Sequence, residues 1–169
     1  MVTVRHEGPG DRAVIRSVNA RALGQPAKAE LVSALRERGQ ITLSLVAVQE
    51  GRMVGHILFS PVTIESDNEI YPAVGLGPKA VLPELQRQGI GSLLIKAGLE
   101  ECRQVGHERV VVLGHAEYYP RFGFIPASQY GVRCEYDVPD EVFMALELRK
   151  GAYRGKVGTA KYQPEFNEL

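Results

Sequence analysis

The first quarter of the chain shows one strand pattern followed by two helical patterns. Val2–Arg5 alternates apolar and polar side chains, which predicts a first strand. After Pro9-Gly10-Asp11, with Asp11 as a candidate helix cap, apolar residues recur at helical spacing to about Leu23. Gly24-Gln25-Pro26 breaks the pattern, and Pro26 suits the first turn of a second helix that stops at Gly39. We expect both helices to lie over one side of a sheet.

Strand patterns joined by turn signals follow. Leu43–Val48 has the β-branched content of a buried strand, and Glu50-Gly51-Arg52 is a hairpin signal. The returning strand, Met53–Ser60, continues to Ile64 through Pro61, which predicts a bend or an edge there. Tyr71–Leu82 predicts a further strand, interrupted at Gly75–Pro78 by a bulge or a close approach to the backbone.

The second half of the chain begins with a long amphipathic pattern, Ser92–Val105, which predicts a helix. Arg109–Leu113 is a continuous apolar run of the kind buried on both faces. One crossover separates it from Lys79–Leu82, so we expect these two strands to be parallel. Val142–Leu148 predicts the last core strand, and the tail from Arg149 has no predicted place.

Composition narrows the class of protein. The 169 residues are 44% hydrophobic and 24% charged, which is typical of one globular domain. Twenty basic side chains balance twenty acidic ones, which argues against a broad nucleic-acid or membrane surface. No apolar run is long enough to span a bilayer or to form a signal peptide, so we expect a cytoplasmic protein. Cys102 and Cys134 form no CxxC pair and the four histidines lack metal-site spacing, so we expect free thiols and no metal.

The stretch from Val81 to Gly91 predicts an anion site. A strand, a polar loop and a helix start follow one another, and the first backbone N–H groups of a helix have no internal partner. Gly89 and Gly91 allow a phosphate close to the backbone, and Gln86, Arg87 and Gln88 add donors. The simpler alternative is an ordinary glycine turn before a helix.

Spacing excludes two named phosphate motifs. A P-loop requires GxxxxGK[ST], but Gly89 is followed by Ile90-Gly91-Ser92 with no lysine in the required place. A dinucleotide fingerprint requires GxGxxG, and Leu94 stands where the third glycine is needed.

The motif that fits is Gln86-x-x-Gly89-x-Gly91, followed by Tyr119 four residues before Gly123-Phe124. In these two motifs, and over about Thr3–Leu148, the chain resembles the GCN5-related N-acetyltransferase (GNAT) superfamily. The stretches Gly55–Val62, Gly75–Pro78 and Leu113–Phe124 resemble its bacterial YhbS-like branch. The resemblance implies an α+β fold: a central mixed, mostly antiparallel twisted sheet with helices on both faces. We expect one domain over residues 1–149, with residues 150–169 as an extension packed on it.

The resemblance implies an acetyl-CoA-dependent N-acetyltransferase in which an amine of a small molecule or protein attacks the thioester directly. A backbone N–H near Val81 would stabilise the oxyanion, and Tyr119 would protonate the CoA sulfur. The two N-terminal helices would form part of the acceptor pocket. The residues expected to bind acetyl-CoA are Val81, Leu82, Gln86, Arg87, Gln88, Gly89, Ile90, Gly91, Ser92 and Phe122.

Several alternatives stay open at this point. The general base is His56, His115 or water, and Glu65, Asp67 and Glu69 are a solvated loop or a steering patch for a cationic substrate. A non-catalytic acyl-CoA sensor and a toxin-like enzyme acting on charged tRNA are the competing functions. The balance of 20 basic and 20 acidic side chains argues against the second, although it leaves room for a local basic patch at Arg149–Lys161, and no nucleic-acid partner is expected. A homodimer is compatible with the resemblance.

Overall fold

The computed structural model describes residues 1–168. The helices are α1 (Arg12–Leu23), α2 (Pro26–Glu37) and α3 (Ile90–Gln104). The strands are β1 (Val2–His6), β2 (Leu43–Gln49), β3 (Arg52–Glu65), β4 (Ile70–Val81), β5 (Arg109–Leu113), β6 (Ile125–Pro126), β7 (Val132–Cys134), β8 (Phe143–Glu147) and β9 (Gly158–Lys161). Short 3-10 helices are η1 (Pro83–Leu85), η2 (Tyr119–Phe122), η3 (Ala127–Tyr130), η4 (Asp140–Val142) and η5 (Pro164–Glu168).

The chain divides into two compact units that interleave along the sequence. Unit 1 comprises residues 1–60 and 77–100 and the tail from Gln163, and unit 2 comprises residues 61–76 and 101–162. Strands β3 and β4 and helix α3 therefore each contribute residues to both units.

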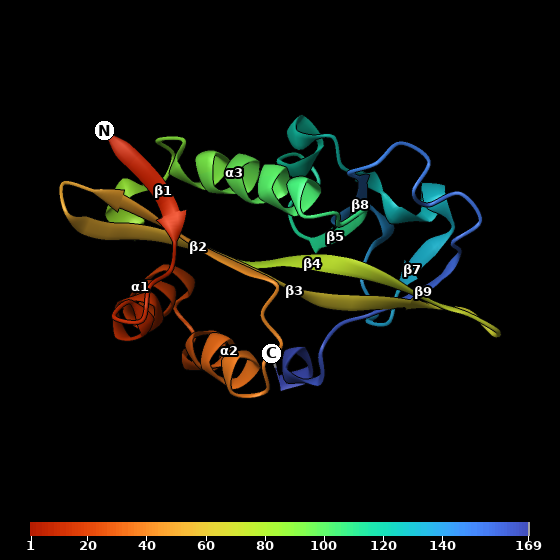
Figure 1. The fold of residues 1–169 in the computed structure, drawn as a ribbon, viewed down its shortest axis with the longest axis horizontal. Helices are drawn as coiled ribbons and strands as arrows, with labels where there is room; N and C mark the ends of the chain where they lie inside the picture. The colour runs from red at the N-terminus through yellow and green to blue at the C-terminus, as the bar shows by residue number, and fades with distance from the viewer. Residues whose placement is uncertain (169) are drawn as a thin grey trace. The chain divides into compact units, whose positions relative to one another are not determined.

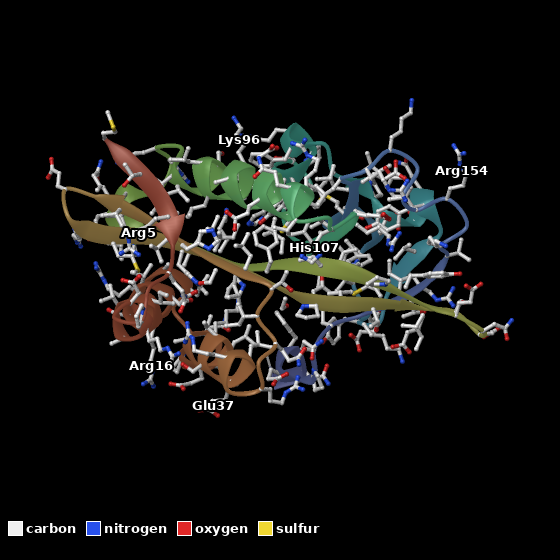
Figure 2. The ribbon with its side chains drawn as sticks, viewed as in Figure 1. Arg5, Arg16, Glu37, Lys96, His107 and Arg154 are labelled. Atoms are coloured by element: carbon white, nitrogen blue, oxygen red, sulfur yellow. The ribbon has the colours of Figure 1, made fainter. Side chains whose placement is uncertain are left out.

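Unit 1 is built on antiparallel pairing of β1 with β2 and of β2 with β3. Figure 1 shows α1 and α2 on one side of these strands and α3 on the other. Adjacent residues of β3 explain why: a Cβ on Gly55 would lie 3.1 Å from Leu94 of α3, whereas the His56 ring lies against Asn19 of α1. The outer faces of the helices are polar, and Arg16 on α1 and Lys96 on α3 point outward (Figure 2).

The predicted helix and hairpin boundaries of unit 1 are confirmed. Helix α1 ends at Leu23 with Gly24 in the left-handed conformation (φ 66°), and α2 begins at Pro26. Glu50 and Gly51 have φ values of 52° and 76°, as a two-residue hairpin turn requires.

The predicted capping role of Asp11 is wrong. Asp11 stands at the N-cap position of α1, but its side chain makes no cap hydrogen bond. Its carboxylate instead accepts from the Gly8 N–H at 2.6 Å and from Arg5 Nη1 at 2.6 Å. These partners occupy the carboxylate, and the hydrogen bonds from Arg5 and then Gly8 lower the pKa of Asp11 to about 2. Asp11 therefore ties the helix entrance to β1.

Unit 2 combines parallel and antiparallel pairing. Strand β5 is parallel to β4 and antiparallel to β8, and β8 pairs with β6. Strand β9 pairs antiparallel with Thr63–Glu65 of β3 and parallel with β7. Pro61 lies between the end of the β2 register at Phe59 and the start of the β9 register at Thr63, so neither of these two pairings includes it.

Two details of the strand prediction need correction. The β4–β5 register covers Val74–Leu76 opposite Val110–Val112, so the parallel direction is confirmed but Lys79–Leu82 is not the paired segment. The register ends where Gly77 adopts φ 139° and the strand becomes irregular. Val142–Leu148 is also not the last strand, because Gly158–Lys161 forms β9.

The tail preceding β9 is fixed by long-range contacts. The Tyr153 side chain is 2% exposed, and its hydroxyl donates to the Val110 carbonyl at 2.9 Å. Arg109 Nη1 donates to the Ala152 carbonyl at 2.7 Å. Local sequence periodicity carries no information on such contacts, which explains why the tail had no predicted place.

Candidate functional site

The anion loop connects β4 to α3 and is shaped by two left-handed residues. After η1 the chain passes through Gln86–Gly89, and Arg87 and Gly89 have φ values of 65° and 85°. Glycine accepts this conformation without strain, whereas arginine is an uncommon residue there. Helix α3 begins directly afterwards at Ile90, two residues before the predicted start at Ser92, so Gly91 lies inside the helix.

The start of α3 presents backbone donors. The helical ladder begins with the Leu93 N–H donating to the Gly89 carbonyl at 3.0 Å, so the N–H groups of residues 89–92 precede it. The Ile90 side chain is buried and anchors the helix start against β3. Gln86, Arg87, Gln88 and Gly89 are exposed, and Gly91 and Ser92 are half-buried. The structure therefore brings all the predicted loop residues together at a helix N-terminus.

Gln86 has a bracing role that the sequence did not reveal. Its Nε2 donates to the Val81 carbonyl at 3.1 Å, which closes the loop onto the end of β4. The Leu82 N–H donates to the Val54 carbonyl of β3 at 2.9 Å. Because backbone groups alternate along a strand, the Val81 N–H and C=O face away from β3. Val81 and Leu82 are themselves buried.

A charged network joins the loop to α1 and to the β2–β3 hairpin. Glu84 of η1 accepts from Arg21 Nη2 at 3.0 and 3.1 Å and from Arg52 Nη2 at 3.1 Å. A backbone hydrogen bond at Glu84, followed by those from Arg21 and Arg52, lowers the pKa of Glu84 to about 2. The carboxylate therefore stays ionised at any physiological pH. The sequence offered no signal for this network, whose members lie far apart along the chain.

Tyr119, the predicted catalytic residue, lies in η2 directly after β5. Its side chain is 6% exposed and packs edge-on against the rings of Tyr118 and Phe124, with centroid distances of 5.2 and 5.7 Å. Burial, with a smaller contribution from Tyr118, raises the pKa of Tyr119 to about 12. Phe122 is half-buried in the same aromatic cluster. Tyr119 and Phe122 belong to unit 2, whereas the anion loop belongs to unit 1.

The two histidines proposed as bases occupy very different positions. The His56 side chain is fully buried, with Nδ1 3.1 Å from Asn19 Nδ2 and Nε2 2.9 Å from Ser44 Oγ. An amide nitrogen only donates, so Nδ1 is the unprotonated acceptor and Nε2 carries the proton. Burial, with a smaller effect of Arg36, lowers the pKa of His56 to about 3. His115, by contrast, is exposed after β5.

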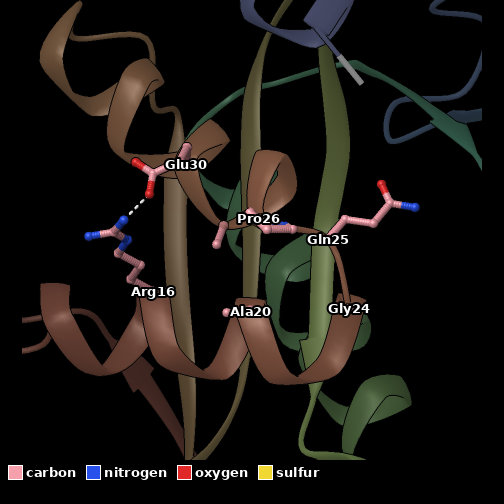
Figure 3. Close-up of a pocket in the computed structure, with 7 residues that line it drawn as sticks. Arg16, Ala20, Gly24, Gln25, Pro26 and Glu30 are labelled. Carbon is pink, nitrogen blue, oxygen red and sulfur yellow. Dashed lines mark hydrogen bonds and ion pairs between the residues drawn. The ribbon is translucent and has the colours of Figure 1, made fainter.

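A hollow of about 300 Å³ lies between α1 and α2 (Figure 3). Small or apolar residues form much of its wall, and an ion pair between Arg16 and Glu30 bridges the two helices beside it. Sequence reasoning expected part of a pocket from these helices but did not single out its lining residues, which are Arg16, Ala20, Gly24, Gln25, Pro26, Ala29 and Glu30.

Among the residues that the structure describes, no group of three or more His, Cys, Asp or Glu side chains could hold a metal ion, and no helix is long and apolar enough to cross a membrane. Both cysteines are free thiols, and burial raises the pKa of the Cys102 thiol to about 12. Thiolate chemistry at Cys102 is therefore disfavoured at neutral pH.

Comparison with known proteins identifies the family to which this chain is similar. The family model of the Acetyltransferase (GNAT) family matches residues 15–124. The uncharacterized N-acetyltransferase YjhQ of Escherichia coli K12 is 43% identical over 134 residues, 78% of this chain and 74% of YjhQ. The uncharacterized N-acetyltransferase YhbS of the same strain is 34% identical over 167 residues, 98% of this chain and 99% of YhbS.

Two solved structures of acetyltransferases are also similar to this chain. The crystal structure of E. coli YhbS in complex with CoA has a TM-score of 0.92 and 34% identity, covering 98% of this chain and 92% of that one. A GNAT family acetyltransferase from Brucella melitensis, in complex with acetyl-CoA, has a TM-score of 0.81 and 35% identity, covering 98% of both chains. These findings confirm the resemblance and the predicted mixed, mostly antiparallel fold.

Proposed function

The chain belongs to the acetyltransferase (GNAT) family, and from this premise we propose that it transfers the acetyl group of acetyl-CoA to a primary amine. The observation that carries the proposal is the loop Gln86–Ser92, in which left-handed residues turn the chain into the N-terminus of α3. The CoA and acetyl-CoA complexes of two relatives more than 30% identical to this chain support the same donor.

In this proposal the donor is held mainly by backbone groups. The N–H groups at the start of α3 receive the pyrophosphate, and the Arg87 guanidinium adds a permanent positive charge. The backbone of Val81, which faces away from β3, pairs with the pantetheine amides as an added strand would. The Val81 N–H also supplies a donor for the oxyanion that develops as the thioester is attacked.

The transfer itself exchanges one bond for another. The amine nitrogen forms a bond to the acetyl carbon while the carbon–sulfur bond breaks, and the electron pair leaves with sulfur. Tyr119 donates its proton toward that sulfur, because its raised pKa keeps the phenol protonated at neutral pH. The neutral amine loses one proton as the amide forms, and Tyr119 regains one from solvent after CoA leaves as the thiol, so charge and protons balance over the reaction.

The proton of the amine is taken by water or by His115. His56 is a poor candidate, because it is fully buried and its lowered pKa makes it a weak base. We expect His115→Gln to lower kcat if His115 is the base, because only the imidazole can accept the proton of the amine. An unchanged kcat assigns the proton to water.

We further propose that the hollow between α1 and α2 receives part of the acceptor. Arg21 on α1 is bonded to Glu84 of η1, so the helix that forms one wall is attached to the donor loop within unit 1. Filling the hollow with Ala20→Leu is expected to raise the KM for the amine and to leave the Kd for acetyl-CoA unchanged. An unchanged amine KM, measured for the best acceptor found, would contradict this assignment.

The proposed activity is tested by following free thiol released from acetyl-CoA in the presence of a panel of small amines and lysine peptides. Release that depends on both the amine and Tyr119 supports the enzyme. Acetyl-CoA binding without turnover on every amine would instead favour the sensor function. We place the reaction in the cytoplasm, where acetyl-CoA is available and free thiols such as Cys102 and Cys134 persist.

A further inference from the structure

Gly114 lies unusually close to Tyr119. A Cβ added to Gly114 would stand 2.2 Å from Cε2 of the Tyr119 ring, 2.8 Å from Cδ2 and 3.2 Å from Cζ, the carbon that bears the hydroxyl. The backbone of Gly114 is not in the left-handed region, so no conformational reason requires glycine here. What requires it is the ring of Tyr119.

Gly114 is held by its backbone, whereas the Tyr119 ring is held by side-chain packing. The Gly114 N–H donates to the Val142 carbonyl at 3.0 Å, directly after the β5–β8 register ends at Leu113 opposite Phe143. The Tyr119 ring is packed between Tyr118 and Phe124. Its backbone N–H donates to the His115 carbonyl at 3.4 Å, in the first turn after the strand. A side chain at Gly114 would therefore displace the ring rather than the strand.

We propose that Gly114 is a positioning residue for the reaction: its missing side chain fixes where the Tyr119 hydroxyl lies. This inference rests on the proposed acid role of Tyr119. To reach ordinary contact with a Cβ, the ring edge must shift by more than about 1 Å, and misplacements of this size can cost a reaction about 100-fold in rate.

The test is a double-mutant cycle of Gly114→Ala and Tyr119→Phe. We expect Gly114→Ala to lower kcat by about 10- to 100-fold while the Kd for acetyl-CoA stays within about 2-fold of wild type. In the Tyr119→Phe background, the same substitution should change kcat by less than about 3-fold, because the hydroxyl that it misplaces is already absent. Equal effects in both backgrounds would overturn the inference.

Two other glycines serve as matched controls. Gly10→Ala introduces a Cβ with no heavy atom within 4 Å, so it should leave kcat and stability unchanged. Gly98→Ala creates a similar clash, 2.4 Å from the ring of Phe59 on β3, so it should lower the melting temperature without the loss of kcat per folded molecule. If Gly98→Ala lost as much kcat as Gly114→Ala, the loss in Gly114→Ala would be explained by general destabilisation, which would overturn the inference.

Failure of the acid role and failure of the positioning role can be told apart. If Tyr119→Phe retains full activity, the acid role falls, and the positioning of the ring is then judged by NMR. The ring signal of Tyr119, assigned by its loss in Tyr119→Phe, should shift in Gly114→Ala and stay in place in Gly98→Ala. Should Gly114→Ala fold poorly, Tyr119→Ala in the same chain should restore its melting temperature, because it removes the ring. No shift and no restoration would overturn the inference.

Discussion

Tyr119 and His56 are both buried, and burial shifts the pKa of each side chain for the same physical reason. Desolvation disfavours the charged form of each side chain, so it raises the pKa of the phenol and lowers the pKa of the imidazole. Tyr119 thus keeps the proton that a general acid must give. His56 loses the basicity that a general base needs, and its two hydrogen bonds fasten α1 to the sheet instead.

The first prediction concerns Tyr119→Phe. We expect kcat to fall about 100-fold or more, the range typical of a lost general acid, with little change in the Kd for acetyl-CoA. Because the pKa of Tyr119 is about 12, wild-type kcat should show no alkaline loss from this group below about pH 11. The measurement is kcat against pH at saturating donor and amine. Identical profiles for the two proteins would remove the acid role.

The second prediction concerns the acid side of the stability profile. His56 has a folded-state pKa of about 3 against an ordinary value of 6.5, so unfolding takes up a proton between these two pH values. The contribution of His56 to the free energy of unfolding should be fully present above about pH 6.5. Below that pH, the free energy of unfolding should fall by up to about 1.4 kcal/mol per pH unit. Urea unfolding at pH 7, 6 and 5 measures this slope.

Substitution of the histidine provides the control for that slope. His56→Gln should lower stability at pH 7, because a glutamine does not reproduce the hydrogen bonds of the imidazole to Asn19 and Ser44. It should also remove the contribution of residue 56 to the pH dependence of stability. His115→Gln changes an exposed ring and should leave the slope intact. An unaltered slope in His56→Gln would assign the acid sensitivity to other groups.

At the scale of elements, the connection from β4 to α3 brings the groups proposed to bind acetyl-CoA into one short loop. Its two left-handed residues, its helix terminus and the Gln86 brace are all local features. A sequence pattern records glycine positions and helix starts, which explains why spacing predicted an anion loop here and excluded two other phosphate motifs, whereas the hydrogen bond from Gln86 was not predicted.

The third prediction tests the loop through Gly89→Ala. Gly89 has φ 85°, and a non-glycine residue in the left-handed region costs about 1–2 kcal/mol. We expect the substitution to distort the loop and to raise the Kd for CoA by at least about 5-fold, as measured by calorimetry. Gly51→Ala places the same strain in the β2–β3 hairpin (φ 76°) and should lower stability without changing that Kd. Equal Kd values for the two variants would mean that the loop tolerates the change.

Other elements were beyond reach of the sequence for one physical reason: their positions depend on partners far along the chain. Strand β9 exists because Thr63–Glu65 and β7 offer it backbone partners. The parallel register was misplaced because the strand irregularity at Gly77 ends the pairing, and periodicity does not report where pairing stops. The Glu84 network, whose members also lie far apart, leaves no trace in residue spacing, and the Gly114–Tyr119 contact depends on side-chain packing that spacing does not report.

At the scale of the whole molecule, the C-terminal tail is used in both units. Its earlier part forms β9 in unit 2, and η5 lies against α2 in unit 1. Arg38, at the end of α2, donates through Nε to Glu165 at 2.5 Å and through Nη2 to Gln163 at 2.8 Å. The hydrogen bond and charge of Arg38 lower the pKa of Glu165. The tail is therefore an integral part of the fold, and we propose that it packs as an extension of the catalytic domain.

The fourth prediction follows from that anchor. Glu165→Gln should lower the free energy of unfolding by up to about 1 kcal/mol, because the pair is partly exposed and such pairs are weak. The difference from wild type should shrink in about 1 M salt, where exposed charges are screened. Chemical unfolding at low and high salt measures both effects. A difference that persists undiminished in salt would point to packing of η5 and not to charge.

The contact between Gly114 and Tyr119 also has a consequence for how such a chain can change over generations. The tyrosine ring occupies the space that any side chain at residue 114 would need, so the two positions are not free to vary independently. A descendant that exchanged the tyrosine for a smaller residue would be released from the need for glycine. One that first replaced the glycine would misplace the tyrosine. Among related sequences the two residues are therefore expected to be inherited as a pair and lost in a fixed order, the tyrosine before the glycine.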